Sequence, residues 1–203
     1  MNPFPTWRRA LSTKWSPDRT ERLIARAEAR YVALRRDEPR PAHPRLGRHL
    51  DEFILPGLAL HQELLATGTT RDDSLDVVAT ALAASVEPER RRMAALSRLP
   101  LVVFVWRLGI RGHMHRNFPP DGWDTEWLEV SSRRIAFNIR RCFYLDTLSR
   151  WEAPELTRLY CDCDDVVFSG LPARIRWQRT QTLARGGALC DFCFERVRAP
   201  GRG

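Results

Sequence analysis

The chain has 203 residues, of which 43% are hydrophobic, and carries a formal net charge of +8. With this length and composition the chain need not be disordered, because enough apolar side chains are present to build the core of one domain, or of one domain with a helical extension. Lys14 is the only lysine, and arginines are scattered throughout the sequence. A nucleic-acid binder more often clusters both residue types, so the charge argues against nucleic acid as a partner.

The N-terminal segment is expected to be an irregular arm followed by one helix. Residues 1–15 contain aromatic, proline and basic residues without periodicity. They lack the apolar core of a secretion signal, so we expect a cytoplasmic protein. Ser16, Pro17 and Asp18 form a helix-start signal, and the helix should end near Arg36. Three prolines follow and cannot continue a helix.

Four more helices are expected in the first half of the chain. Apolar residues at helical spacing predict a helix over 45–67, which Pro56 should kink. Thr70 opens a third helix with a capping-box pattern, and a fourth, highly charged helix should begin at Pro88. The apolar stretch 100–110 predicts a buried helix that is too short to span a membrane. A loop rich in glycine and proline should follow it.

Alternating patterns and turn residues indicate a sheet in the second half. Two strands, two short helices and a final hairpin turned by Gly186 and Gly187 are expected. We therefore predict an α+β fold, with an N-terminal helical layer followed by a four-stranded antiparallel sheet with short helices. The predicted strands are 127–130, 134–139, 174–184 and 188–197, and the predicted short helices are 142–151 and 154–161.

The five cysteines lie in the last third of the chain: Cys142, Cys161, Cys163, Cys190 and Cys193. Their odd number favours reduced thiols over a disulfide framework. Four clustered cysteines also suggest structural zinc. Strand alternation argues against zinc, because it turns Cys190 and Cys193 to opposite faces, and no metal is expected. Cys190 is then either a small core residue or a reactive thiol.

Two strings of residues stand out. The first comprises 54–61, Glu63, Leu64 and Gly68, and the second comprises 137–142, 154–156, Cys161, Asp164, 179–187 and 190–192. In order and spacing they resemble the L-2-amino-thiazoline-4-carboxylic acid hydrolase family, over roughly residues 50–197. Cys163 and Cys193 depart from the family pattern, and the first 45 residues are an addition to it. The resemblance implies residues 1–45 as arm and first helix, and 46–203 as a hydrolase-like α+β domain, helical over 46–122 and sheet-containing over 123–198.

The resemblance implies a hydrolase that opens a C–N bond in a small cyclic amidine or thiazoline-like amino acid, without a cofactor. Such chemistry needs a nucleophile, a carboxylate for the amidinium and a proton donor for the leaving nitrogen. Cys190 or Cys161 is the candidate thiolate, and Asp164 and Asp191 are the candidate carboxylates. Three alternatives remain: Cys161 packs a helix end, Asp164 lies in a solvated turn or helix cap, and Asp191 is an exposed strand residue.

Substrate-binding roles are predicted for three further residues. Arg179 matches the family string and suits the substrate carboxylate. Thr180 is a second candidate, although strand threonines are common. His61 either lines the pocket or lies on a helix surface. The pair His113 and His115 suggests a metal ligand or a base, but its glycine-bounded position favours a surface loop.

Three other functions remain open at this level. The first is a tailoring enzyme of specialised metabolism that acts on another small heterocycle. The second is a non-catalytic small-molecule-binding module, and the third is a basic nucleic-acid binder. The ring-opening hydrolase ranks above all three. A small molecule is the expected partner, no membrane partner is expected, and the oligomeric state is open, a homo-oligomer included.

Overall fold

The computed structural model describes residues 2–96 and 102–197. The chain divides into two compact units. Unit 1 comprises Met1–Glu87 and Tyr144–Cys163, and unit 2 comprises Pro88–Phe143 and Asp164–Gly203. Among the helices in the described ranges, none has both the length and the apolar character that a bilayer crossing requires.

The expected arm is a helix, so that prediction is wrong. Helix α1 covers Phe4–Leu11, and its buried residues Phe4, Trp7 and Leu11 follow helical spacing. The Trp7 indole donates a hydrogen bond of 2.7 Å to the Ser85 hydroxyl. Proline is tolerated in the first helical turn, where the backbone N–H has no intrahelical partner. The prolines therefore mark the start of this helix and do not prevent it.

Helix α2 forms as predicted, over Pro17–Asp37. The Ser16 side chain caps it by accepting a hydrogen bond from the Arg19 backbone N–H. In the middle of α2, Arg26 and Arg30 donate to the two oxygens of Glu63, at 2.9 and 2.8 Å. Glu63 is buried, and these two guanidinium groups compensate its charge and join α2 to α4.

The second predicted helix is divided into three parts. Helix α3 covers Pro44–His49, a π-helical turn (η1) covers Leu50–Ile54, and α4 covers Leu55–Ala66. The π-helical turn ends at Ile54, two residues before Pro56, which cannot donate a backbone hydrogen bond to the preceding turn. The continuous helix that was predicted is therefore wrong at this widened turn, and the kink at Pro56 stays a prediction.

Helix α5 runs without interruption over Arg71–Leu96, so the predicted break at Pro88 is wrong. Its N-terminus has the predicted cap, because the Thr70 hydroxyl accepts a hydrogen bond from the Asp73 backbone N–H. A proline inside a helix removes one backbone hydrogen bond and often bends the helix, but it need not end it. The boundary between the two units falls at this proline.

Helix α6 covers Val102–Asn117 and is longer and more exposed than predicted. Part of the predicted helix 100–110 lies outside the described residues. Phe104, Val105 and Leu108 are exposed, so the expectation of a buried helix is wrong. His113 and His115 lie on this helix and not in a loop. Glycine is only moderately unfavourable inside a helix, so Gly112 does not end it.

The four-stranded antiparallel sheet of unit 2 confirms the predicted fold class. Its order is β1-β2-β4-β3, so the last strand in the chain pairs with two neighbours. The two predicted short helices are also present, and the second extends farther than expected. The strands are β1 Trp123–Val130, β2 Arg134–Cys142, β3 Ile175–Gln178 and β4 Cys190–Arg196, and the helices are α7 Phe143–Arg150, η2 Pro154–Leu156 and α8 Thr157–Phe168.

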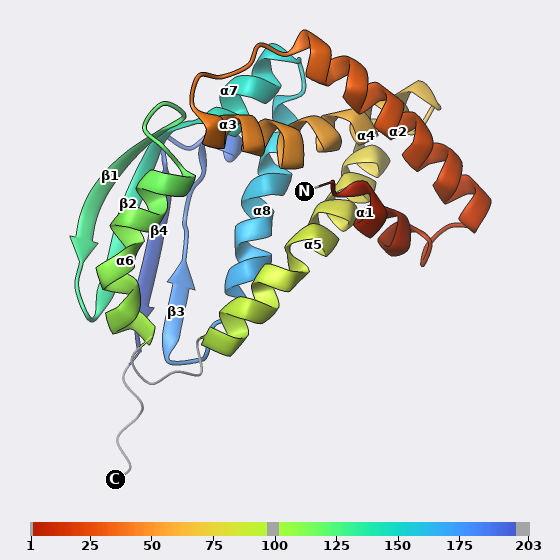
Figure 1. The fold of residues 1–203 in the computed structure, drawn as a ribbon. Coiled ribbons are helices and arrows are strands. Elements are labelled where there is room, and N and C mark those ends of the chain that lie inside the picture. The colour runs from red at the N-terminus through yellow and green to blue at the C-terminus, as the bar shows by residue number, and fades with distance from the viewer. Residues whose placement is uncertain (1, 97–101, 198–203) are drawn as a thin grey trace. The chain divides into compact units, whose positions relative to one another are not determined.

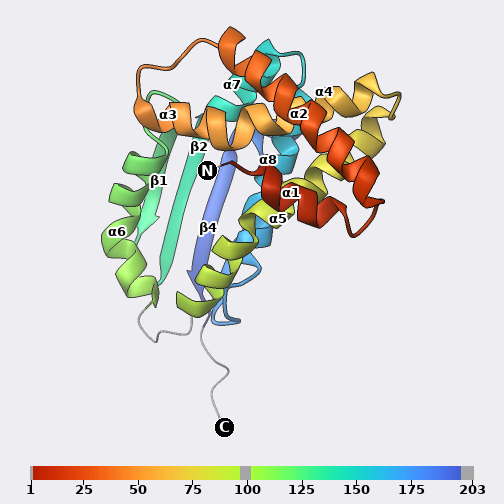
Figure 2. The same cartoon turned by 45° about the vertical axis from the view of Figure 1, so that its right-hand side comes forward.

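One face of this sheet carries a row of four aromatic rings, one from each strand. Trp127 lies 5.0 Å from Phe137, which stacks on Phe192 at 4.8 Å, and Trp177 lies 5.4 Å from Phe192. Helix α6 lies beside the sheet (Figures 1 and 2), and its Trp106 packs edge-on against Phe194. The row gives the sheet an apolar floor in unit 2.

The final hairpin has a long connection and not the predicted tight turn. Strand β3 ends at Gln178, and residues 179–189 form a loop that contains the short helix η3, Leu183–Arg185. Gly186 has a φ of 80° and ends η3 in the left-handed conformation that favours glycine. The two glycines therefore mark the end of a small helix.

Candidate functional site

Arg179 is held by two carboxylates of α8 in unit 2. Its guanidinium donates to Asp164 Oδ2 and to Asp165 Oδ2, both at 2.9 Å, and its side chain is only 6% exposed. The guanidinium also lies 5.5 Å from the ring centres of Trp177 and Phe192. Asp164 is thus a helical residue paired with arginine, and the alternative of a solvated turn is wrong.

Asp191 anchors the start of the 179–189 loop. Its Oδ1 accepts hydrogen bonds from the backbone N–H groups of Thr180 and Gln181, at 2.9 and 2.7 Å. Its Oδ2 accepts from the Thr180 hydroxyl at 2.6 Å. Partial burial raises the pKa of Asp191, but these hydrogen bonds outweigh it and lower the pKa below its usual value. The carboxylate takes the place of a strand partner, so β3 stops at Gln178 and Thr180 lies in the loop.

Cys190 is a buried thiol beside this anchor. Its Sγ accepts a hydrogen bond of 3.3 Å from the Leu183 backbone N–H. Burial raises the pKa of Cys190, the Leu183 N–H and the charge of Arg179 oppose that rise, and the charges of Asp164 and Asp191 add to it. The thiol is therefore within electrostatic reach of all three charged groups. We call Asp164, Arg179, Cys190 and Asp191 the thiol cluster.

The loop above the thiol is closed by its own polar groups. The Gln181 side chain accepts a hydrogen bond from the Ala188 backbone N–H at 3.1 Å, across the loop. The Thr182 carbonyl accepts from Arg185 and Gly187. The Thr182 hydroxyl is buried and has no hydrogen-bond partner among the residues that the structure describes. The alternating pattern of the sequence places Thr182 in the predicted strand 174–184, as an ordinary strand residue. Nothing in that pattern indicates a buried hydroxyl without a partner.

The other cysteines occupy separate positions, and none of the five forms a disulfide. Cys161 lies on α8 in unit 1, three residues before Asp164, a spacing that places both on one face of the helix. The Cys193 thiol accepts a hydrogen bond of 3.3 Å from Arg134 Nε. Within the described ranges, no three histidine, cysteine or acidic side chains are grouped so that they could hold a metal ion.

His61 lies in unit 1 within a buried polar cluster of its own. Its Nδ1 lies 2.8 Å from the Ser74 hydroxyl, and its Nε2 lies 3.6 Å from Glu155, which also pairs with Arg71. Burial lowers the pKa of His61, and Glu155 only partly opposes this. His61 is 2% exposed, so the alternative of a helix-surface histidine is wrong.

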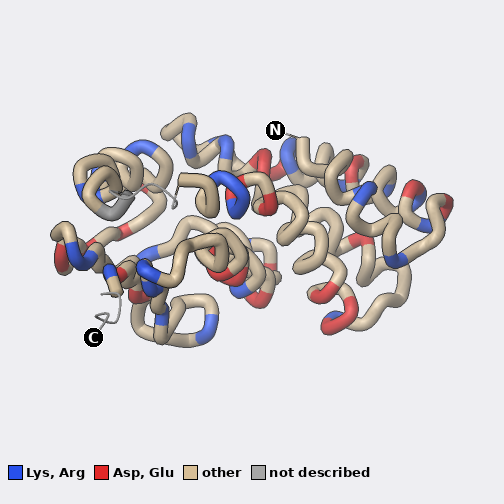
Figure 3. Tube along the Cα trace, turned by 90° about the horizontal axis from the view of Figure 1, so that it is seen from below, with Lys and Arg blue, Asp and Glu red and all other residues tan. Residues whose placement is uncertain are grey.

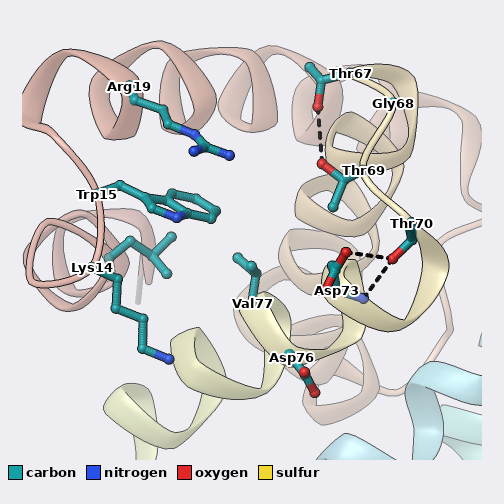
Figure 4. Close-up of a pocket in the computed structure, with 11 residues that line it drawn as sticks. Lys14, Trp15, Arg19, Thr67, Gly68, Thr69, Thr70, Asp73, Asp76 and Val77 are labelled. Atoms are coloured by element: carbon teal, nitrogen blue, oxygen red, sulfur yellow. Dashed lines mark hydrogen bonds between the residues drawn. The ribbon is translucent and has the colours of Figure 1, made fainter.

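A hollow of about 550 Å³ lies in unit 1 between two helix connections (Figure 4). The turn between α1 and α2 supplies one wall, including Lys14 and Trp15, and Arg19 follows on α2. The turn between α4 and α5, with the first turns of α5, supplies the other wall. None of the hollow's residues was among the candidates that the sequence suggested.

A second hollow, of about 530 Å³, lies in unit 2 between α6 and the first strand pair. His115 and Arg141 line it, together with Arg111, which lies over the Trp127 ring at 4.9 Å. Thr125 also lines it and is in register with Cys190 through β2. Two strand spacings of about 4.8 Å each therefore separate the backbones of Thr125 and Cys190.

Comparison with known proteins identifies a family. The family model described as L-2-amino-thiazoline-4-carboxylic acid hydrolase matches residues 54–194. This match confirms the resemblance inferred from the two strings of residues and includes the whole thiol cluster. Searches of curated proteins and of solved structures give no match.

Proposed function

The chain belongs to the L-2-amino-thiazoline-4-carboxylic acid hydrolase family, and from this premise we propose that it hydrolyses a C–N bond of a small thiazoline-like cyclic amidine with help from Cys190. The thiol cluster carries the proposal. It combines a thiol, carboxylates and a guanidinium from helix α8 and from residues 179–191, and the family match covers all of them. These are the groups that ring opening of an amidine requires.

Asp164 is the proposed partner of the substrate's amidinium group. Its side chain is 40% exposed, and its Oδ2 accepts a hydrogen bond from Arg179. A carboxylate fixed in this way favours the protonated amidine, and protonation makes the ring carbon more electrophilic. Arg179 then acts as a positioning residue for Asp164 and Asp165, in addition to its proposed attraction for the substrate carboxylate.

Cys190 is the proposed nucleophile. Its sulfur forms a bond to the ring carbon, and the bond between that carbon and the ring nitrogen breaks. The proton that the thiol loses is the one that the departing nitrogen gains, so a neutral resting thiol suits this step. Water then attacks the same carbon, the product is released, and the thiol recovers its proton. One water molecule is consumed in total.

Asp191 has a supporting role in this proposal. Both of its oxygens accept hydrogen bonds from Thr180 and Gln181, so it fixes the loop that covers the thiol. The buried Thr182 hydroxyl, which has no partner in the described part of the chain, is a further group that a substrate or a water can use. Cys161 remains the second candidate for the nucleophile.

The proposal is tested with L-2-amino-thiazoline-4-carboxylic acid and purified protein. Mass spectrometry and NMR should show a product heavier by one water with a new free amine, because the ring C–N bond breaks. A new free thiol would mean that the C–S bond breaks and would overturn the C–N assignment. Other small cyclic amidines in the same assay distinguish a tailoring enzyme with a different substrate.

Matched cysteine variants test the role of Cys190. Cys190→Ala should lower kcat/KM by about a hundredfold or more, as expected for loss of a nucleophile. Cys193→Ala is the control, because Cys193 lies on the same strand and bonds Arg134 instead. A folded Cys190→Ala protein with full activity would exclude a covalent step at Cys190. If Cys161→Ala alone loses activity, Cys161 of α8 is the nucleophile instead.

A further inference from the structure

The hollow of unit 1 has charges of opposite sign on facing walls. Lys14 and Arg19 lie on the wall from α1 and α2, and Asp73 and Asp76 lie on the α5 wall (Figure 4). Within the described ranges, no ion pair joins either cation to either carboxylate. Lys14 donates instead to the Thr80 hydroxyl at 3.0 Å, and Asp73 accepts from Thr70 at 2.7 Å. Lys14 thus reaches the α5 wall, whereas Arg19 and Asp73 lie on opposite walls with no ion pair between them.

The surface between these charges is partly apolar. The Trp15 ring extends into the hollow, and Leu11 and Val77 also line it. The Arg19 guanidinium lies over this ring, 4.4 Å from its centre, which holds the positive charge at the rim. Hydroxyl groups of Thr67 and Thr69 add hydrogen-bonding capacity beside the acidic wall. The hollow thus offers a cationic end, an apolar middle and an acidic end.

We propose that this hollow binds a small zwitterion with an apolar body, of dipeptide size. Its carboxylate would meet Arg19, its ammonium would meet Asp73 and Asp76, and its apolar body would lie against Trp15. A volume of about 550 Å³ falls within the range of roughly 300–1,000 Å³ typical of small-molecule sites. A ligand with both charges satisfies the two walls at once, whereas a simple anion or cation leaves one wall unmatched.

This site gives a role to the N-terminal addition. The family match begins at residue 54, so the cationic wall lies outside it and the acidic wall lies inside it. Neither wall contains a residue of the thiol cluster. The proposed site is therefore independent of the hydrolase proposal, and a negative result for one leaves the other standing.

The net charge of the chain does not by itself create this site. Basic and acidic residues are interspersed along the described chain (Figure 3), and many arginines are paired with carboxylates. The hollow differs in that Arg19 stacks on Trp15 while two carboxylates on α5 face it without an ion pair to it. An arrangement that keeps opposite charges apart favours a ligand that bridges them.

The test is calorimetric titration of the full-length protein with the dipeptide Gly-Phe. Binding is expected for Gly-Phe, and affinity should fall about tenfold or more when the amine is acetylated or the carboxylate is amidated, because each change removes one charge-assisted contact. Equal binding of the capped and uncapped dipeptides, or no binding of Gly-Phe at millimolar concentration, would overturn the proposal.

Point variants are used to locate the bound dipeptide. Truncation of the N-terminus is unsuitable, because it would also remove Phe4, Trp7 and Leu11 from the core. Arg19→Gln and Asp76→Asn should each weaken Gly-Phe binding about tenfold. Arg22→Gln is the matched control, since Arg22 is exposed on the same helix and does not line the hollow. Circular dichroism checks that all variants fold, and equal affinity in Arg19→Gln and Arg22→Gln would place the ligand elsewhere.

Discussion

The Tyr160 hydroxyl lies where the first side-chain atom of any larger residue at position 57 would be. It donates a hydrogen bond of 3.0 Å to the Phe53 carbonyl and lies 3.3 Å from the Ile54 carbonyl. Both carbonyls belong to the π-helical turn before Pro56. Gly57 is therefore required because a tyrosine approaches the backbone closely, and this approach stabilises an irregular part of the helix.

Gly57→Ala should destabilise the protein by about 1–3 kcal/mol, because the added methyl group forces Tyr160 away from its two acceptors. Tyr160→Phe alone should cost about 1 kcal/mol through the lost hydrogen bond. The double variant should be more stable than the sum of the two changes predicts, since the ring carbon Cζ would lie 3.2 Å from the new Cβ and can adjust. Urea unfolding of the four proteins measures this coupling, and strictly additive free energies would contradict it.

His61 should make the stability of the protein depend on pH in the acid range. Its pKa is lowered by burial, and the charged groups around it are Glu155, which raises the pKa, and Arg71, which lowers it. The unfolded chain then binds a proton that the folded chain does not, so stability is full above the unfolded pKa of about 6.5 and falls as the pH drops below it.

The measurement for His61 is chemical unfolding at several pH values between 5 and 8. His61→Asn should lower the free energy of unfolding at pH 8 and flatten its decline toward pH 5. His115→Asn, at an exposed position on α6, serves as the control and should keep the original slope. An unchanged slope in His61→Asn would show that other groups cause the pH dependence.

Local patterns were enough to predict α2, the sheet and the capped start of α5, because each has its own signal in the sequence. The segments that were predicted wrongly depend on distant partners. Residues 4–11 form a helix because Phe4, Trp7 and Leu11 find a core, and α5 continues through Pro88 despite the lost hydrogen bond. Propensity alone contains neither effect.

The candidate site shows the same division. The family strings indicated Asp164, Arg179, Cys190 and Asp191. In unit 2, Arg179 pairs with Asp164, and the charges of Arg179, Asp164 and Asp191 all act on the pKa of Cys190. No strand pattern predicts that the Asp191 side chain ends β3 by binding Thr180 and Gln181. The charged walls of the unit 1 hollow come from two helix connections, and no sequence motif links such connections.

Cys190 should react slowly with alkylating reagents near neutral pH. Burial raises its pKa, so the thiolate that reacts with iodoacetamide is scarce until the pH exceeds the ordinary range for cysteine of about 8.5. Peptide mapping by mass spectrometry should show Cys193 modified before Cys190 at pH 8, because Cys193 is less buried. Arg179→Gln should slow Cys190 further, since its charge favours the thiolate. Rapid alkylation of Cys190 at pH 7 would contradict the raised pKa.

Asp191→Asn should loosen the 179–189 loop and lower stability. An amide accepts at only one of its two positions, so hydrogen bonds from Thr180 or Gln181 are lost or weakened, at a cost of about 1–3 kcal/mol at pH 7. The lowered pKa of Asp191 means that its contribution is present above the unfolded pKa of about 3.9 and is lost as the pH falls below that value. The difference in the free energy of unfolding between Asp191→Asn and the unaltered protein should therefore shrink at pH 3.

Hydrogen exchange of the Thr180 and Gln181 amides measures the opening of this loop directly. The control is Asp124→Asn, which changes an exposed carboxylate of the same unit. Exchange that is equally slow in Asp191→Asn would mean that the loop is held by Gln181 and the Thr182 carbonyl alone, and that Asp191 is available for a direct role in the reaction.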